Sequence, residues 1–192
     1  MQRIKHSSIN RREQVENSVP RDHEIRRPLG RLPQYRMTNS TFDLRPGEVV
    51  GKSPNRADAH LQFIGRIRTP WSETRDCPKR GDEQSGPVCQ LELEEDLAPA
   101  LKGLAMGDRI IVLYWMHLSR RDLLQQSPKS DGQTMGTFAI RSPARPNPIA
   151  LSYVRLLSVE ATTLSVRGLD CVDGTPLLDI KSEFCALQGS QP

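Results

Sequence analysis

The sequence predicts a mainly β fold: a small antiparallel β-barrel with one or two short helices, preceded by a disordered N-terminal tail. Short runs rich in β-branched and aromatic residues follow one another closely from residue 61 onward, with turn residues between them. The first sixty residues hold few bulky apolar side chains, too little apolar surface to offset the entropy of folding. We therefore divide the 192 residues into a disordered basic tail (1–60), a β-barrel domain (61–185) and a short C-terminal tail (186–192).

The tail differs from the rest of the chain in charge. Residues 1–60 carry 12 Lys and Arg against 7 Asp and Glu, a net charge of +5, whereas residues 61–192 carry 15 against 16. A basic arm of this kind can help to hold RNA, which is an alternative to simple disorder. A third interpretation of the tail is that translation starts at Met37, which would leave most of these residues out of the protein.

The strands are predicted from the spacing of apolar residues. VCQLELE at 88–94 alternates as a half-buried strand does, whereas RIIVLYWMH at 109–117 is a continuous apolar run, typical of a strand buried on both faces. Pro70 ends the first strand because it has no backbone N–H. Strands are expected at residues 61–68, 88–94, 109–117, 136–142, 149–160, 162–170 and 176–181.

Apolar residues follow the spacing of a helix in one segment of the chain. Leu97, Leu101 and Leu104 follow each other at i, i+4 and i+7, which predicts one short helix with Pro99 in its first turn. The polar segment 119–133 is an excursion between two strands and can hold a second helical turn.

Several classes of protein are excluded by missing patterns. No apolar run approaches the roughly 18 residues of a membrane span, and the N-terminus lacks the apolar region of a secretory signal. There is no glycine-rich dinucleotide motif, no P-loop and no G-x-S-x-G. The four cysteines form no C-x-x-C pair and three of the four histidines lie in the tail, so we predict no disulfide framework and no metal site. Reduced thiols point to a cytoplasmic protein.

The segment RSPARPNPIALS at 141–152 combines two arginines with three prolines. Proline fixes its own φ and pushes the preceding residue toward extended conformations, so the segment is stiff and cannot be helical. A stiff backbone lowers the entropic cost of holding a guanidinium group against a carboxylate or phosphate. The alternative is a proline-rich connection with solvated arginines.

Polar residues also gather in three other segments. LDCVDGTPLLDIK at 169–181 places three aspartates among apolar strand residues, where they can accept hydrogen bonds from hydroxyl or amino groups. CPKRG at 77–81 is a basic loop, and WMHLSRRD at 115–122 places His117 at the end of a strand. The plain alternatives are a hairpin turn, a solvated loop and a structural histidine.

In this order, FIGRIRTPW, CPKRG, the strand that ends in His117, RSPARPNPIALS and LDCVDGTPLLDIK resemble the tRNA methyltransferase O (TsaA-like) family, over about residues 61–181. The resemblance implies a six-stranded β-barrel that forms a homodimer and binds S-adenosyl-L-methionine. It also implies methylation of N6 of threonylcarbamoyladenosine beside the anticodon of a tRNA substrate.

The resemblance further implies which residues contact the cofactor. The expected cofactor-binding residues are Pro78, Lys79, Arg80, His117, Leu118, Arg141, Leu151, Asp170, Cys171, Val172, Asp173, Gly174 and Thr175. No catalytic residue is assigned, because either an aspartate of segment 170–179 or solvent can take the proton that leaves the amino group. Arg145 and Asn147 either brace their loop or face the RNA. The arginines expected to hold RNA are Arg66, Arg68, Arg120 and Arg121.

Two departures from the family pattern affect turnover more than fold. The family usually continues DIK with Pro-Tyr, where this chain has Ser182-Glu183-Phe184, and Ala150 stands where Gly is common. The alternative hypothesis is therefore a non-catalytic β-barrel that binds S-adenosyl-L-methionine or tRNA but has lost methyl transfer.

Overall fold

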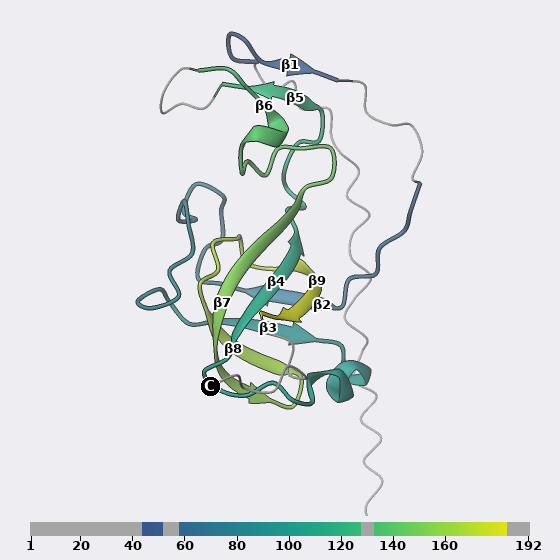
Figure 1. Cartoon of the computed structure of the whole chain (residues 1–192), viewed down its shortest axis with the longest axis vertical. Helices are drawn as coiled ribbons and strands as arrows, with labels where there is room; N and C mark the ends of the chain where they lie inside the picture. Colours follow the sequence, from purple (N-terminus) through teal and green to yellow (C-terminus); the bar gives the residue numbers. More distant parts are fainter. Residues whose placement is uncertain (1–43, 52–57, 128–132, 184–192) are drawn as a thin grey trace, which may run out of the picture. The chain divides into compact units, whose positions relative to one another are not determined.

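The computed structural model describes residues 44–51, 58–127 and 133–183 (Figure 1). Most of the predicted N-terminal tail and the whole predicted C-terminal tail lie outside the described residues. In the described part of the chain, no helix is long and apolar enough to cross a membrane.

Six antiparallel strands close into a barrel in the order β2-β3-β8-β7-β4-β9, which confirms the predicted fold class (Figure 1). The long strand β7 pairs with β4 through its first half and with β8 through its second half. The barrel strands are β2 (Gly65–Arg68), β3 (Cys89–Leu93), β4 (Arg109–Trp115), β7 (Ile149–Glu160), β8 (Thr163–Arg167) and β9 (Thr175–Ser182).

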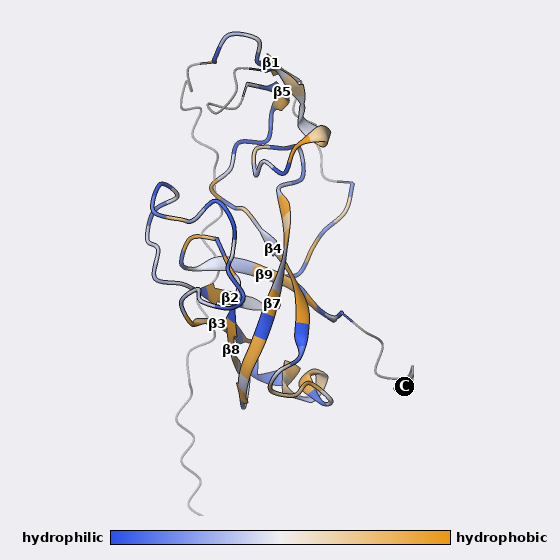
Figure 2. Cartoon of the chain, turned by 60° about the vertical axis from the view of Figure 1, so that its left-hand side comes forward, coloured by the Kyte–Doolittle hydropathy of each residue, from blue (hydrophilic) through white to orange (hydrophobic). Residues whose placement is uncertain are grey.

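The core fills the barrel with every second residue of the strands. Ile67, Val112 and Val154 are completely buried. The prediction that the strand at 109–117 is buried on both faces is wrong, because burial alternates along β4 and its outward residues, such as Leu113, are only half-buried. Figure 2 shows hydrophobic stretches along β4 and β7. An antiparallel barrel packs a core on its inner face only, so the outer apolar residues of these strands stay partly exposed.

A second, three-stranded sheet has the order β1-β5-β6. Its strands are β1 (Val49–Val50), β5 (Leu123–Gln126) and β6 (Met135–Gly136). β1 comes from the segment 1–60 that the sequence assigns to the tail, and the Gly51 N–H donates to the Asp122 carbonyl at 2.7 Å. In the segment 119–133, where the sequence predicts a helical turn, residues 123–126 form β5, whose backbone pairs with both neighbouring strands, and residues 128–132 lie outside the described residues.

Two short 3-10 helices complete the described structure. η1 (Glu95–Leu101) lies near the predicted helix and buries Leu101 against the core. η2 (Thr137–Ala139) and irregular backbone at 140–142 stand where the sequence predicts a strand at 136–142, and only Gly136 of that segment lies in a strand. The reason is tertiary: the Thr137 hydroxyl donates to the Leu123 carbonyl, and the Arg145 guanidinium binds the carbonyls of Thr137 and Ile140. Those two carbonyls are therefore occupied by a side chain instead of a neighbouring strand.

Candidate functional site

All the segments identified above as candidate binding segments meet at one rim of the barrel. Because neighbouring strands are antiparallel, the ends of β2, β4 and β8 lie beside the starts of β3, β7 and β9. The β2–β3, β4–β7 and β8–β9 connections therefore all leave from this rim. Every expected cofactor-binding residue lies on these connections or on the adjoining strand ends.

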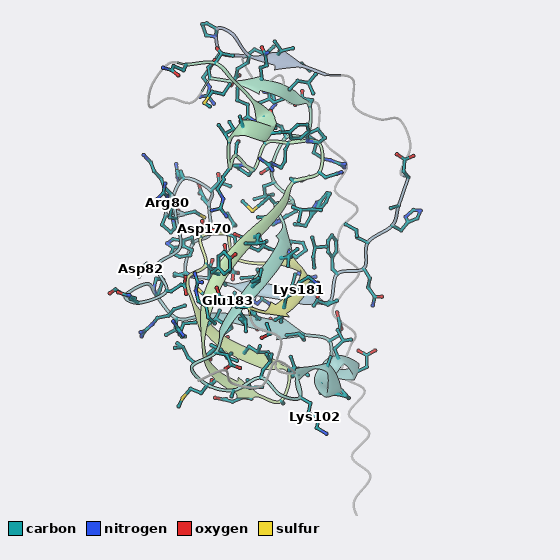
Figure 3. All side chains as sticks on the ribbon, viewed as in Figure 1. Arg80, Asp82, Lys102, Asp170, Lys181 and Glu183 are labelled. Carbon is teal, nitrogen blue, oxygen red and sulfur yellow. The ribbon has the colours of Figure 1, made fainter. Side chains whose placement is uncertain are left out.

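The β2–β3 loop is pressed against the β8–β9 loop at two glycines. A Cβ added to Gly81 would lie 1.7 Å from the Gly168 carbonyl oxygen, so no other residue fits without a backbone shift. Gly168 itself has φ of +116°, a conformation that favours glycine. This contact brings Arg80, which follows the second cationic residue Lys79 in the chain, close to Asp170 (Figure 3). Both cationic side chains are exposed and make no ion pair with any described residue.

Asp170 is oriented from inside the barrel by Tyr114. The Tyr114 hydroxyl donates to Asp170 Oδ1 at 2.8 Å and lies 2.8 Å from the Ser152 hydroxyl. A tyrosine hydroxyl has one hydrogen, so Ser152 is the donor in the second bond. Burial, followed by the negative charge of Asp170, raises the pKa of Tyr114, which keeps it a neutral donor. Asp170 Oδ2 has no hydrogen-bond partner among the described residues.

The rest of the 170–175 turn is built mostly from buried or bonded groups. The side chains of Cys171, Val172 and Thr175 are buried, and the Thr175 hydroxyl donates to the Val172 carbonyl at 2.6 Å. Asp173 accepts hydrogen bonds from the Thr69 N–H at 3.0 Å and from Arg68 at 3.5 Å. The buried side chains therefore shape the turn. At the rim, these residues can offer a ligand their backbone N–H and carbonyl groups.

Burial also raises the pKa of the thiols near this turn. For Cys89 the pKa rises to about 11, and for Cys77 the charges of Asp170 and Asp76 add to the effect of burial. These thiols stay protonated near neutral pH and are poor nucleophiles.

The proline-rich segment is held by side chains that supply the donors its prolines lack. Arg145 donates to the carbonyls of Ser142 at 2.9 Å and Ile140 at 2.5 Å, so it braces the loop. Arg121 donates to the Pro146 carbonyl at 2.7 Å and lies 5.3 Å from the centroid of the Trp115 ring.

Arg141 lies at the exposed end of the same segment. Its one hydrogen bond to a described residue is long, 3.4 Å to the Leu151 carbonyl. The guanidinium group therefore lies beside the start of β7 with most of its donors available.

His117 lies at the end of β4 and is half-buried. Burial lowers its pKa, and the positive charge of Arg66 lowers it further. His117 is therefore neutral near pH 7 and can accept or donate a hydrogen bond. Leu118, the next residue, is exposed beside it.

Most of the arginines expected to hold RNA are engaged within the protein. Arg68 pairs with Glu92 at 2.8 Å, and Arg120 binds Asp122 through two bonds of 2.8 and 2.9 Å. The exposed cations at the rim are instead Lys79, Arg80 and Arg141.

Sequence reasoning missed two groups that support the rim. Tyr114 is hidden in an apolar run, and no local signal distinguishes it from a core residue. Arg109 binds Glu83 through two bonds of 2.8 Å and also contacts Glu183, in a polar hollow on the side of the barrel. Since Arg109 is paired with two carboxylates, it serves to fasten the β2–β3 loop to the barrel wall. Among the described residues, no cluster of His, Cys, Asp and Glu is placed to hold a metal ion.

Comparison with known proteins places this barrel in a family. Residues 66–186 match the tRNA-methyltransferase O N-terminal domain. The probable S-adenosyl-L-methionine-binding protein VirR of Rhizobium radiobacter is 49% identical over 140 residues, covering 73% of this chain and 79% of that one. An S-adenosyl-L-methionine-binding protein of Archaeoglobus fulgidus is 38% identical over 138 residues, covering 69% and 99% of the two chains.

A solved structure agrees with these sequence matches. A crystal structure of TrmO superposes with a TM-score of 0.56 at 29% identity, over 71% of this chain. The aligned part spans 64% of the solved chain, less than two thirds of its length. The ordered motifs, the closed six-stranded barrel and these matches agree, and the chain belongs to the tRNA methyltransferase O (TsaA-like) family.

Proposed function

We propose that this protein is an S-adenosyl-L-methionine-dependent tRNA methyltransferase, and that it methylates N6 of threonylcarbamoyladenosine beside the anticodon. The observation that carries the proposal is the meeting of the three family motifs, 77–81, 141–152 and 169–181, at one rim of the barrel. The relatives named as S-adenosyl-L-methionine-binding proteins support the choice of cofactor.

The free groups at the rim suit this cofactor. S-adenosyl-L-methionine carries a carboxylate, an ammonium group and ribose hydroxyls. Lys79 and Arg80 are exposed cations without an ion-pair partner among the described residues, and they suit the carboxylate. Asp170 Oδ2 is a free acceptor beside them for a hydroxyl or ammonium donor. Gly174, where an added Cβ would meet nothing within 4 Å, adds backbone that a ligand can approach closely.

Methyl transfer requires the protein chiefly to position the two reactants. When bound, the cofactor supplies an electrophilic methyl group for the exocyclic nitrogen. The residues of the rim hold the two reactants in line, and such positioning lowers a barrier without a covalent nucleophile or a metal. Asp173 and Asp179 are engaged with Arg68 and Lys181. If an aspartate of segment 170–179 takes the departing proton, Oδ2 of Asp170 is the available atom.

The test is a methylation assay on the natural substrate. The purified protein is incubated with S-adenosyl-L-methionine and total tRNA from cells that lack the modification. The tRNA is then digested to nucleosides, whose masses are measured by mass spectrometry. We expect threonylcarbamoyladenosine one methyl group heavier. No such product, with a known active relative succeeding on the same tRNA, would refute the proposal.

The second candidate is a barrel that binds S-adenosyl-L-methionine or tRNA without transferring the methyl group. The names of the relatives, which specify binding, favour it, as does the departure from the family pattern at Ser182-Glu183. Calorimetric binding of S-adenosyl-L-methionine together with a negative methylation assay supports this candidate over the enzyme.

We also propose that the protein is a cytoplasmic homodimer. Support comes from the outer face of β4 and β7, where the register pairs Leu113 with Leu151 and Ile111 with Tyr153. Leu151 and Tyr153 are each 39% exposed, an apolar surface of the kind that a second copy can cover. Sedimentation analysis of the full chain tests this part, and a monomer at micromolar concentration refutes it.

A further inference from the structure

In the part of the chain that the structure describes, one strongly exposed aromatic side chain remains without a role in the fold. Phe138 is 84% exposed, whereas the tryptophans of the chain and Tyr114 are at least partly buried. A phenylalanine gains nothing from exposure to water, and burying such an apolar side chain is favourable. A partner that covers Phe138 would therefore gain a contact.

The backbone that carries Phe138 is held firmly. Phe138 is the middle residue of η2, and the preceding residue, Thr137, is buried with its hydroxyl bonded to both Leu123 and Gln126 at 2.8 Å. Arg145 binds the carbonyls of Thr137 and Ile140, one on each side of Phe138. Fixing the turn in advance lowers the entropy that a ligand must overcome when it packs on the ring.

The position of this turn connects Phe138 to the candidate site. Arg141 is three residues further along and reaches the Leu151 carbonyl at the start of β7, on the site's rim. Three extended residues span at most about 11 Å, so the backbone of Phe138 lies within that distance of Arg141, whose side chain reaches the rim. Arg141 is exposed and has no carboxylate partner among the described residues, so the neighbourhood of the ring is positively charged.

An exposed aromatic ring on a rigid turn beside a cation suits an unpaired nucleobase. Single-stranded RNA loops are bound by stacking of splayed bases on aromatic side chains, with arginine near the phosphates. We infer that Phe138 is a stacking platform for a base of the anticodon loop that flanks the target adenosine. This inference rests on the proposed function, because it assigns the RNA of that reaction to a particular side chain.

The experiment compares three replacements of Phe138 by fluorescence anisotropy with a synthetic anticodon stem-loop RNA that carries threonylcarbamoyladenosine. Phe138→Ala should weaken RNA binding by roughly 5- to 100-fold, the loss expected for one stacked base. Phe138→Leu should be equally weak, because leucine is apolar but has no π-face. Phe138→Trp should bind at least as tightly as the wild type, and the fluorescence of the new tryptophan should fall on binding.

Two controls separate stacking from other effects. Met106→Ala removes a side chain that is 80% exposed and precedes β4 at the opposite rim, and it should leave RNA binding unchanged. Calorimetry with S-adenosyl-L-methionine should give the same affinity for Phe138→Ala and the wild type, which shows that the variant is folded with its cofactor site intact.

The possible failures are distinct. If the wild type does not bind the RNA, both the proposed function and the role of Phe138 are wrong. If the wild type binds and Phe138→Ala stays within about twofold of it, only the stacking role is refuted. If Phe138→Leu binds the RNA as well as the wild type, the side chain makes an apolar contact and stacking is refuted. If Phe138→Ala changes the oligomeric state instead of RNA affinity, Phe138 is a contact between protein chains.

Discussion

Tyr114→Phe isolates the hydrogen bonds that connect the barrel core to the candidate site. The variant keeps the ring, which is 2% exposed, and removes only the hydroxyl that donates to Asp170 and accepts from Ser152, both at 2.8 Å. No cavity larger than one oxygen atom forms, so any loss of stability comes from the polar groups left without a partner.

The size of the effect follows from the charges involved. A hydrogen bond to a charged group contributes about 1.5–3 kcal/mol and one between neutral groups about 0.5–1.5 kcal/mol. Asp170 is partly exposed, so water replaces part of the loss, and we expect a decrease of about 2 kcal/mol in the free energy of unfolding. For a domain of this size the melting temperature then falls by roughly 6–10 °C. The affinity for S-adenosyl-L-methionine should fall as well, because Asp170 loses its orientation.

The assay is equilibrium unfolding in urea, with calorimetry for the cofactor. Tyr153→Phe is the matched control, since it makes the same chemical change on β7, where Tyr153 is half-exposed and its hydroxyl has no hydrogen-bond partner among the described residues. The control should stay within about 0.5 kcal/mol of the wild type. Equal stability of the two variants would show that the Tyr114–Asp170–Ser152 contacts do not support the rim.

Four further predictions concern the rim and the small sheet. Gly81→Ala should destabilise by about 1–3 kcal/mol because its Cβ meets a backbone oxygen, and thermal melting measures this. Arg141→Ala should weaken S-adenosyl-L-methionine binding by about 1.5–3 kcal/mol in calorimetry; unchanged binding removes Arg141 from the site. The pKa of His117 is lowered in the folded state, so the unfolded state binds more protons below about pH 6.5. Wild-type stability should therefore fall from pH 7.5 to 5.5 more steeply than that of His117→Gln, and parallel curves would contradict this. A chain that starts at Met37 keeps β1 and should resist proteolysis like the full chain, whereas one that starts after β1 should be cleaved faster near β5.

The fold class was predictable because it depends on local patterns. Alternating apolar residues at 88–94 and the β-branched run at 109–117 mark strands β3 and β4 without any knowledge of their neighbours. The ordered motifs at 77–81, 141–152 and 169–181 likewise identify the family from the chain alone. The local prediction failed at 136–142, where Arg145 occupies carbonyls that a strand would have used.

The sequence by itself therefore determined a β-barrel of a particular family with a stiff, arginine-bearing segment. Only the tertiary structure decided that Arg145 braces its loop, that Arg141 stays available, and that Tyr114 orients Asp170. The physical reason is the range of the interactions: strand formation and proline stiffness act within a few residues of the chain, whereas Tyr114 and Asp170 are 56 residues apart in sequence. Such a pair meets only after barrel closure brings the end of β4 beside the loop that enters β9.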